Sequence, residues 1–219
     1  VPVAQIVARL CDVAPNGVSQ RISYRAFNLT HHSGHDSPTS LTPDQHYTAE
    51  ISLNECAHHL RAGHTLRLAL SNSYWPIIWP APTPTNITLD LANCSLDLPV
   101  RSVTLESDPC APHGPQSFPI LAAEILRTPD ARAKTITQDD GTIVQETFDD
   151  YGAARDPDHG MEVGSHVTTQ YAIHPDDPAT ATFLSQWNFS FKRDDWQVEI
   201  DTENAMTSDA QNFYVHRKL

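Results

Sequence analysis

Residues 66–71 of the chain read Leu66-Arg67-Leu68-Ala69-Leu70-Ser71, so that three leucines alternate with smaller or polar residues. Successive side chains of a β-strand point to opposite faces, and a strand that packs on a core from one side therefore shows this period of two. The same alternation recurs in residues 47–54 and 87–91. Long helical periodicity is almost absent, and the pattern therefore favours an all-β fold.

Turn-forming residues separate these segments. Pro15-Asn16-Gly17 follows an expected first strand at residues 3–13, and Asn-Gly favours the positive φ angles of a tight hairpin. Thr42-Pro43-Asp44 and Ala62-Gly63 precede the next two alternating segments. This spacing of strands and turns predicts a β-sandwich or a jelly roll over residues 1–107.

A second antiparallel β domain, or an extension of the first, is predicted for residues 108–219. The stretch 108–115 is rich in proline and resembles a linker. Alternation resumes in residues 161–173, and the polar residues 193–195 separate two further alternating segments, which predicts a hairpin. Asp139-Asp140-Gly141 predicts another hairpin turn, while residues 118–127 are ambiguous between a strand and a short helix.

Composition excludes several classes of partner. The formal net charge is −13, with 14 Lys and Arg against 27 Asp and Glu, which disfavours binding to nucleic acid or to anionic membranes. No apolar run approaches the roughly 20 residues of a membrane helix. The start at Val1 lacks signal-peptide features and a Met, so we expect a cytoplasmic chain that begins inside a longer protein or after processing.

The four cysteines do not suggest a metal site, because no CxxC pair is present and a zinc ribbon is therefore excluded. We expect free, mostly buried thiols. Loose histidine clusters offer weak metal candidates in His31, His35 and His64, but they lack His-x-His or HExxH spacing. Imidazoles that hydrogen-bond the backbone in polar loops are the favoured interpretation by a wide margin, and no cofactor is expected.

A catalytic serine of the α/β-hydrolase type needs a G-x-S-x-G turn between a strand and a helix. Gly164-Ser165-His166 lacks the second glycine and lies in an alternating segment. Paired aspartates such as Asp139-Asp140 and Asp176-Asp177 lie in turn-like contexts, where Asp is common. The chain is therefore predicted to carry no catalytic residues of its own.

The stretch 74–84 reads Tyr-Trp-Pro-Ile-Ile-Trp-Pro-Ala-Pro-Thr-Pro, and its prolines exclude a helix interior or a central strand. It is predicted to be an extended, aromatic loop. The candidates for an interface with a missing domain, or for a site that limits substrate access, are Tyr74, Trp75 and Trp79. The alternative is a stacking platform for a ligand such as a sugar, in which case the chain is a carbohydrate-binding module.

Four segments resemble one known family. Residues 7–17 read Val-Ala-Arg-Leu-Cys-Asp-Val-Ala-Pro-Asn-Gly and resemble the opening strand of the C-terminal domain of X-prolyl dipeptidyl-peptidases and cocaine-esterase-type (CocE/NonD) serine hydrolases. Asn28-Leu29-Thr30-His31, residues 60–68 and the Ser73-Tyr74-Trp75-Pro76 segment follow in the family's order, although His32 replaces a usual Arg. From about residue 102 onward, the chain resembles an additional β region carried by some of these hydrolases.

The resemblance implies that residues 1–107 form a non-catalytic jelly roll, a β-sandwich of the galactose-binding-like kind. This domain follows an N-terminal α/β-hydrolase domain, which is absent from these residues. The family's Ser, Asp and His triad belongs to that upstream domain, and none of its members maps onto a position here. The implied parent is an X-Pro dipeptidyl-peptidase, an acyl esterase or an amidase. The implied role of this chain is to pack on the catalytic domain and to shape access to its active site, with Tyr74 and Trp75 closest to the contact.

Overall fold

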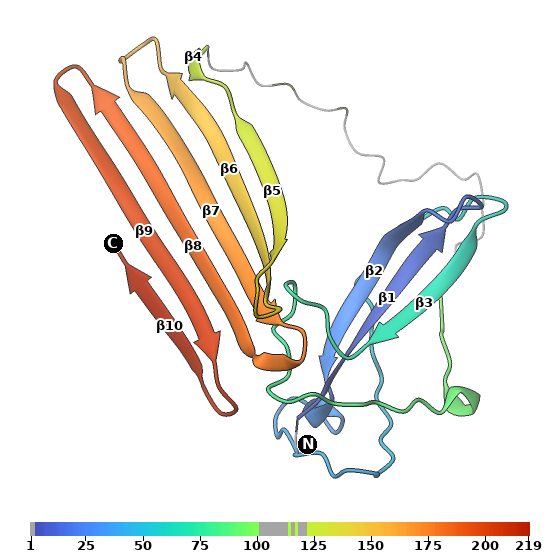
Figure 1. Cartoon of the computed structure of the whole chain (residues 1–219). Helices are drawn as coiled ribbons and strands as arrows, with labels where there is room; N and C mark the ends of the chain where they lie inside the picture. The colour runs from blue at the N-terminus through green and yellow to red at the C-terminus, as the bar shows by residue number, and fades with distance from the viewer. Residues whose placement is uncertain (1–2, 101–113, 115–116, 118–121) are drawn as a thin grey trace.

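The computed structural model describes residues 3–100, 114, 117 and 122–219 (Figure 1). These residues form two antiparallel β-sheets, one of three strands and one of seven, and no α-helix. Two short 3-10 helices, η1 (Leu29–His31) and η2 (Leu91–Asn93), lie in the first region. The predicted all-β class with a second antiparallel β region is confirmed.

The first sheet has the strand order β2-β1-β3, with bounds β1 (Gln5–Val13), β2 (Ser19–Asn28) and β3 (Thr65–Ser71). β1 and β2 form the hairpin expected from Asn16-Gly17, and Gly17 adopts a φ of 85°. β1 pairs with β3 on its other side and is the most buried strand of the sheet, with Val7 fully inaccessible to solvent. The core of the first region therefore surrounds β1.

The second sheet has the order β10-β9-β8-β7-β6-β4, and β5 also pairs with β6. Its strands are β4 (Glu124–Arg127), β5 (Asp130–Thr137), β6 (Ile143–Arg155), β7 (Glu162–His174), β8 (Asp177–Arg193), β9 (Trp196–Ser208) and β10 (Phe213–Lys218). The predicted hairpins at Gly141 and at residues 193–195 connect β5 to β6 and β8 to β9. Within residues 118–127, the described part ends as a strand, and residues 118–121 lie outside the described residues.

The two faces of the second sheet differ in chemistry, because residues that pair across neighbouring strands share a face. One face, here called the aromatic face, carries Val163, Val167, Tyr171, Phe183, Trp187, Phe189, Phe191, Val198, Ile200 and Met206. The other face, here called the charged face, carries Lys134, Glu146, His166, Gln186, Lys192, Glu199, Asp201 and Glu203. Several ion pairs, including Lys134 with Glu146, lie on the charged face.

Two expected strands are wrong, because residues 47–54 and 87–91 form no β-ladder. Burial in residues 47–54 does alternate as the sequence predicts, with the odd-numbered side chains partly buried and the even-numbered ones exposed. Asn54 hydrogen-bonds β2, where its N–H donates to the carbonyl of Tyr24 and its own carbonyl accepts from Ser23 Oγ. Alternation reports burial on one side, whereas a strand also needs a neighbouring strand to hydrogen-bond.

The expectation of mostly buried thiols is also wrong for the described cysteines. Cys11 is buried in β1, whereas Cys56 and Cys94 are exposed, and all three are free. Both exposed thiols lie in segments without regular strands, so no sheet covers them. Cys110 and the predicted boundary at residue 107 lie outside the described residues.

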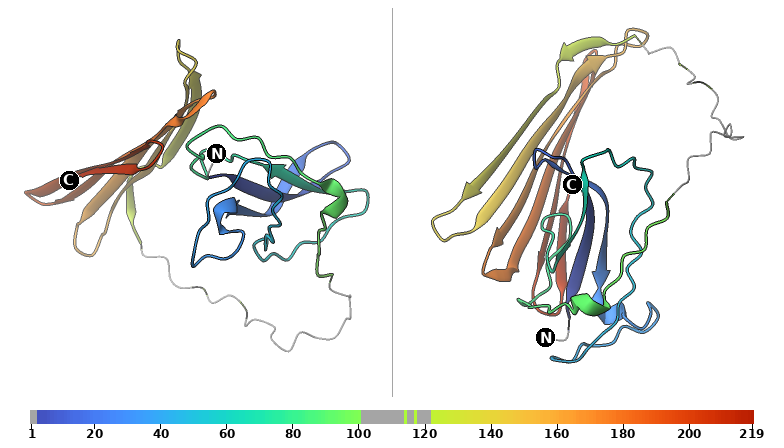
Figure 2. Two further views of the ribbon diagram at one scale, coloured as in Figure 1. Left: turned by 90° about the horizontal axis from the view of Figure 1, so that it is seen from below. Right: turned by 90° about the vertical axis from the view of Figure 1, so that its right-hand side faces the viewer.

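The two sheets lie beside each other as separate layers and approach where the loop after β3 reaches the second sheet (Figures 1 and 2). Extensive strand-to-strand contacts are all made within one sheet or the other among the described residues. The loop 74–84 therefore connects the two layers, as an extended segment without regular structure. The described residues contain no helix with the length and hydropathy needed to cross a bilayer.

Candidate functional site

Tyr74 lies at the first sheet between two arginines. The Arg9 guanidinium carbon is 4.9 Å from the centre of the Tyr74 ring, and the Nη1 of Arg21 donates a hydrogen bond to the Tyr74 hydroxyl. Arg21 also lies 4.4 Å from the ring centre of Tyr24, whose ring meets Tyr74 edge-on at 6.1 Å. Neither arginine forms an ion pair with a described carboxylate, so this cluster presents uncompensated positive charge beside aromatic rings.

Trp75 and Trp79 contact the second sheet. The Trp75 ring lies 6.0 Å from the ring of Tyr171 on β7, and the Trp79 ring lies 5.9 Å from that of Phe213 on β10. The Trp79 indole N–H donates to Ser208 Oγ at 2.9 Å. The two indoles meet at an interplanar angle of 79°, so they present no single flat surface for stacking a sugar.

The three weak metal candidates are not brought together. His31 ends η1 and His35 lies in the loop that follows, with 3.0 Å between their Nδ1 atoms. His64 lies just before β3 and contacts Asp12 instead. No group of three metal-ligating side chains occurs within the described part of the chain.

Asp12 forms a cluster that the sequence did not reveal. Its carboxylate is buried at the end of β1, with His58 Nε2 2.8 Å from Oδ2 and His64 Nδ1 2.7 Å from Oδ1. The hydrogen bond from His58 is the main cause that lowers the pKa of Asp12, and His64 adds to it. An acidic residue in an apolar strand was the available signal, since a buried carboxylate requires partners.

The Asp12 cluster and the other histidine contacts do not assemble a nucleophilic site. The carboxylate of Asp12 orients two imidazoles, but no serine, threonine or cysteine donates to either ring among the described hydrogen bonds. Ser33 Oγ lies 2.8 Å from Nδ1 of His32, but these residues are sequence neighbours in an exposed loop, and no described carboxylate orients His32. Nucleophilic catalysis of this type needs a nucleophile, an imidazole base and a carboxylate that orients the imidazole, all within hydrogen-bonding distance of one another.

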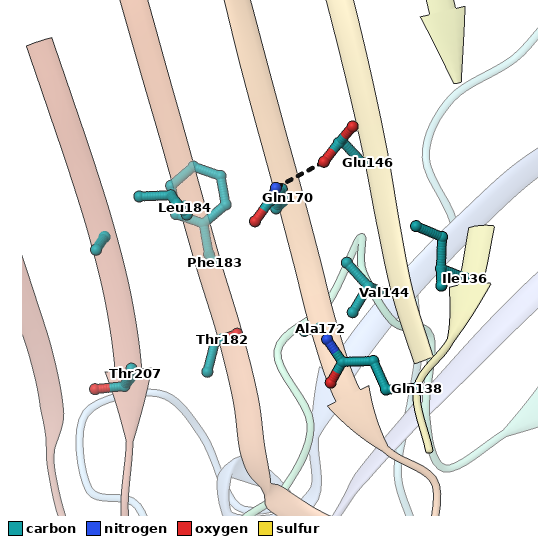
Figure 3. A pocket seen from close by; sticks show the side chains of 11 residues that line it. Ile136, Gln138, Val144, Glu146, Gln170, Ala172, Thr182, Phe183, Leu184 and Thr207 are labelled. Carbon is teal, nitrogen blue, oxygen red and sulfur yellow. Dashed lines mark hydrogen bonds between the residues drawn. The ribbon is translucent and has the colours of Figure 1, made fainter. Parts of the chain in front are cut away.

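An open hollow lies on the charged face of the second sheet, and Figure 3 shows its side chains. Glu146 is the acidic group of the hollow, and it accepts from Gln170 Nε2 at 2.7 Å and pairs with Lys134 Nζ at 2.7 Å. These contacts, with that of Lys134 first, lower the pKa of Glu146 and keep it ionised. Apolar side chains such as Val144, Ala172 and Leu184 line much of the rest, so the hollow offers no reactive pair.

A tier of three nearly parallel rings crosses the aromatic face of the second sheet. The rings of Tyr151 and Trp187 are 5.6 Å apart at 3°, and those of Trp187 and Phe189 are 5.3 Å apart at 4°. Tyr151 is 57% exposed, so the tier reaches solvent. The sequence predicted aromatic alternation in β8, but only the pairing of β6 with β7, and of β7 with β8, brings Tyr151 beside Trp187.

One comparison with known proteins yields a match. A family model described as the X-Pro dipeptidyl-peptidase C-terminal non-catalytic domain matches residues 2–115. The matched residues include the first sheet, the Asp12 cluster and the loop 74–84, and the match ends before β4 begins. No curated protein and no solved structure matches the chain.

Proposed function

Because the chain belongs to the family of X-Pro dipeptidyl-peptidase C-terminal non-catalytic domains, we propose that it is the accessory domain of a serine hydrolase. A non-catalytic C-terminal domain implies a catalytic domain in the same polypeptide. In this proposal, that catalytic domain has an α/β-hydrolase fold of the X-Pro dipeptidyl-peptidase or CocE/NonD type. The accessory domain packs on it and limits which substrates reach its active site.

The chemistry of the described residues supports an accessory role. The buried carboxylate of Asp12 and the acidic group of the hollow, Glu146, are both engaged in structural contacts, and neither lies beside a nucleophile. The parent reaction is acyl transfer from an ester, an amide or an X-Pro peptide to a serine of the catalytic domain, followed by hydrolysis. The role of these residues is to position a surface rather than to move protons.

The Tyr74 cluster is the observation that carries the proposed contact. Trp75 and Trp79 are occupied with the second sheet, whereas Tyr74, Arg9 and Arg21 form a partly exposed group with no described carboxylate partner. Aromatic residues and arginines are enriched at the centres of protein interfaces. A carboxylate or carbonyl of the catalytic domain opposite Arg9 and Arg21 is the expected partner.

The first experiment compares the 219-residue chain with the longer polypeptide that includes the catalytic domain. We expect the longer polypeptide to hydrolyse Ala-Pro-p-nitroanilide or p-nitrophenyl acetate, and the chain alone to show no turnover above buffer. Turnover by the chain alone that a serine-directed inhibitor abolishes would contradict the proposal, because the reacting groups would then lie within these residues.

A second experiment replaces Tyr74 with Ala in the longer polypeptide. Most interface residues cost little when truncated, but a tyrosine at the centre of an interface costs about 1 kcal/mol or more. We therefore expect KM, or the equilibrium constant for unfolding of the assembled protein, to change by about fivefold or more. Tyr47→Ala is the matched control, since Tyr47 lies in the same region and contacts His32 rather than the arginines. An equal effect of both variants would indicate a loss of folding instead of a lost contact.

A further inference from the structure

The aromatic face of the second sheet is only partly covered. At one end, Trp75 packs against the half-buried Tyr171 on β7, and Trp79 contacts one edge of Phe213 on β10, which stays 63% exposed. Toward the other end, where β8 and β9 meet at residues 193–195, no strand of the first sheet makes extensive contacts with this sheet among the described residues. Val163 is 44% exposed there, Trp196 49% and Ile200 36%.

At this uncovered end, the aromatic face is apolar, whereas the charged face of the same strands is polar. Phe189, Phe191 and Val198 lie on it as cross-strand neighbours, beside the ring tier of Tyr151 and Trp187. On the charged face of the same strands, the corresponding positions carry Glu, Asp, Lys and Gln. A sheet with one apolar and one charged face is built to pack its apolar face against another layer.

The covered end indicates what kind of contact the face makes. Two tryptophans of the first region pack edge-on against its rings, and the Trp79 N–H hydrogen-bonds Ser208 at its margin, so this face already serves as an intramolecular interface. The uncovered end continues the same surface without a break in the strands. A further part of the same polypeptide that packs on the uncovered end would therefore enlarge an interface that already exists at the other end.

We propose that the uncovered end of the aromatic face, centred on Val163, Phe189 and Ile200, is a docking surface for the catalytic domain of the same polypeptide. This inference rests on the proposed function, because it needs that domain to be present. It goes further by placing part of the contact on the second region, which lies outside the matched residues. The expected partner surface is apolar, and its contact with the ring tier excludes water.

The test measures how fast a maleimide labels one introduced cysteine. Labelling is resolved by residue with mass spectrometry, so that the native Cys11, Cys56, Cys94 and Cys110 do not interfere. Val163→Cys reports on the aromatic face, and Ile136→Cys is the matched control, since Ile136 is 44% exposed on the charged face. We expect Val163→Cys to be labelled at least about tenfold more slowly in the longer polypeptide than in the chain alone. We expect Ile136→Cys to be labelled equally in both.

The other outcomes overturn the inference in distinguishable ways. Equal labelling of Val163→Cys in both proteins means that the catalytic domain does not cover the face. Protection in the isolated chain, increasing with concentration and accompanied by a dimer in light scattering, means that a second copy is the occupant. Tyr74→Cys, labelled in parallel, separates the two proposals: protection of Tyr74→Cys without protection of Val163→Cys preserves the accessory role and refutes this docking surface.

A charge substitution gives an independent readout. Ile200→Glu places a carboxylate on the aromatic face, and Ile136→Glu places the same group at a similarly exposed apolar position on the charged face. We expect both variants to keep the circular dichroism spectrum of the isolated chain. In the longer polypeptide, we expect only Ile200→Glu to increase cleavage by a protease between the domains, and equal cleavage of both variants refutes the docking surface.

Discussion

The central strands of the two sheets differ in how completely they are buried. β1 carries two buried runs, residues 6–8 and 10–12, separated by the half-buried Arg9, because strands pair with it on both sides and irregular segments cover it. The longer strands β7 and β8 contribute only Gly164, Val167, Ala181 and Ser185 to the buried residues. The first region therefore encloses its own core, whereas the second satisfies its backbone and leaves a face to be covered.

The two sheets also differ in how their positively charged side chains are paired, and here it is the first sheet that lacks partners. Arg127, Lys134 and Arg155 of the second sheet each pair with a carboxylate of the same sheet, so the charges of these three cations are compensated within it. Arg9 and Arg21 of the first sheet interact with rings instead. The difference teaches that each region is incomplete in a different way: the second lacks apolar cover, and the first lacks counter-charge.

The largest expected effect comes from a buried leucine of β1. Leu10 is 4% exposed, and Leu10→Ala should lower the free energy of unfolding by about 2–5 kcal/mol, because it leaves a cavity in a packed core. The corresponding change on the aromatic face, Ile200→Ala, should cost less than about 1 kcal/mol in the isolated chain. Urea denaturation of both variants measures the two values. Similar losses would show that the second sheet has an enclosed core as well.

A glycine at the bulge of β6 should give the next largest effect. Gly152 has a φ of 82°, and a Cβ there would lie 2.5 Å from the carbonyl oxygen of Arg127. Gly152→Ala should therefore destabilise the chain by about 2–4 kcal/mol, from backbone strain and steric overlap together.

Gly17→Ala in the hairpin of the first sheet is the control for Gly152→Ala. Gly17 has a φ of 85°, but no atom lies within 4 Å of the place that a methyl group would take, so only the backbone cost remains. That cost is about 1 kcal/mol. The two variants are compared by thermal unfolding. A larger loss of stability for Gly17→Ala than for Gly152→Ala would mean that the close packing of β4 and β5 around the bulge does not contribute to the stability of the chain.

The smallest effect concerns acid stability at the edge of the second sheet. The Tyr214 hydroxyl and the N–H groups of Gln211 and Asn212 hydrogen-bond the Asp209 carboxylate and lower its pKa to about 2. A carboxyl group whose pKa is depressed on folding stabilises the fold above its unfolded pKa of 3.8, and this contribution is lost as the pH falls toward 2. The pairing of β10 with β9 should therefore loosen between about pH 4 and pH 2.

Nuclear magnetic resonance titration of the Asp209 carboxyl carbon measures this pKa directly. Tyr214→Phe removes the first of the three donors and should raise the pKa of Asp209, although not to 3.8, since the two N–H donors remain. Tyr47→Phe should leave it unchanged. An unchanged pKa in Tyr214→Phe would show that the hydroxyl does not hold the carboxylate.

Alternation and turn chemistry were enough to predict β1, β3, β7 and the two hairpins of the second sheet. The same signal misassigned residues 47–54, where side chains alternate in burial but no neighbouring strand pairs along the segment. The aromatic loop 74–84 was predicted from its prolines, and its irregular path is confirmed. The role of Tyr74, Trp75 and Trp79 at a domain interface stays a prediction, although Trp75 and Trp79 make their described contacts within this chain.

The sequence by itself determined that the chain is β-structured, where its tightest turns lie and which family it resembles, because these depend on neighbours a few residues apart or on short ordered motifs. Only the tertiary structure decided which distant groups meet. His58 and His64 reach Asp12 across 46 and 52 residues, and Trp79 reaches Ser208 across 129. A period of two assigns a residue to a face of a strand, but the partner of that face depends on how the sheets pack, which no local pattern encodes.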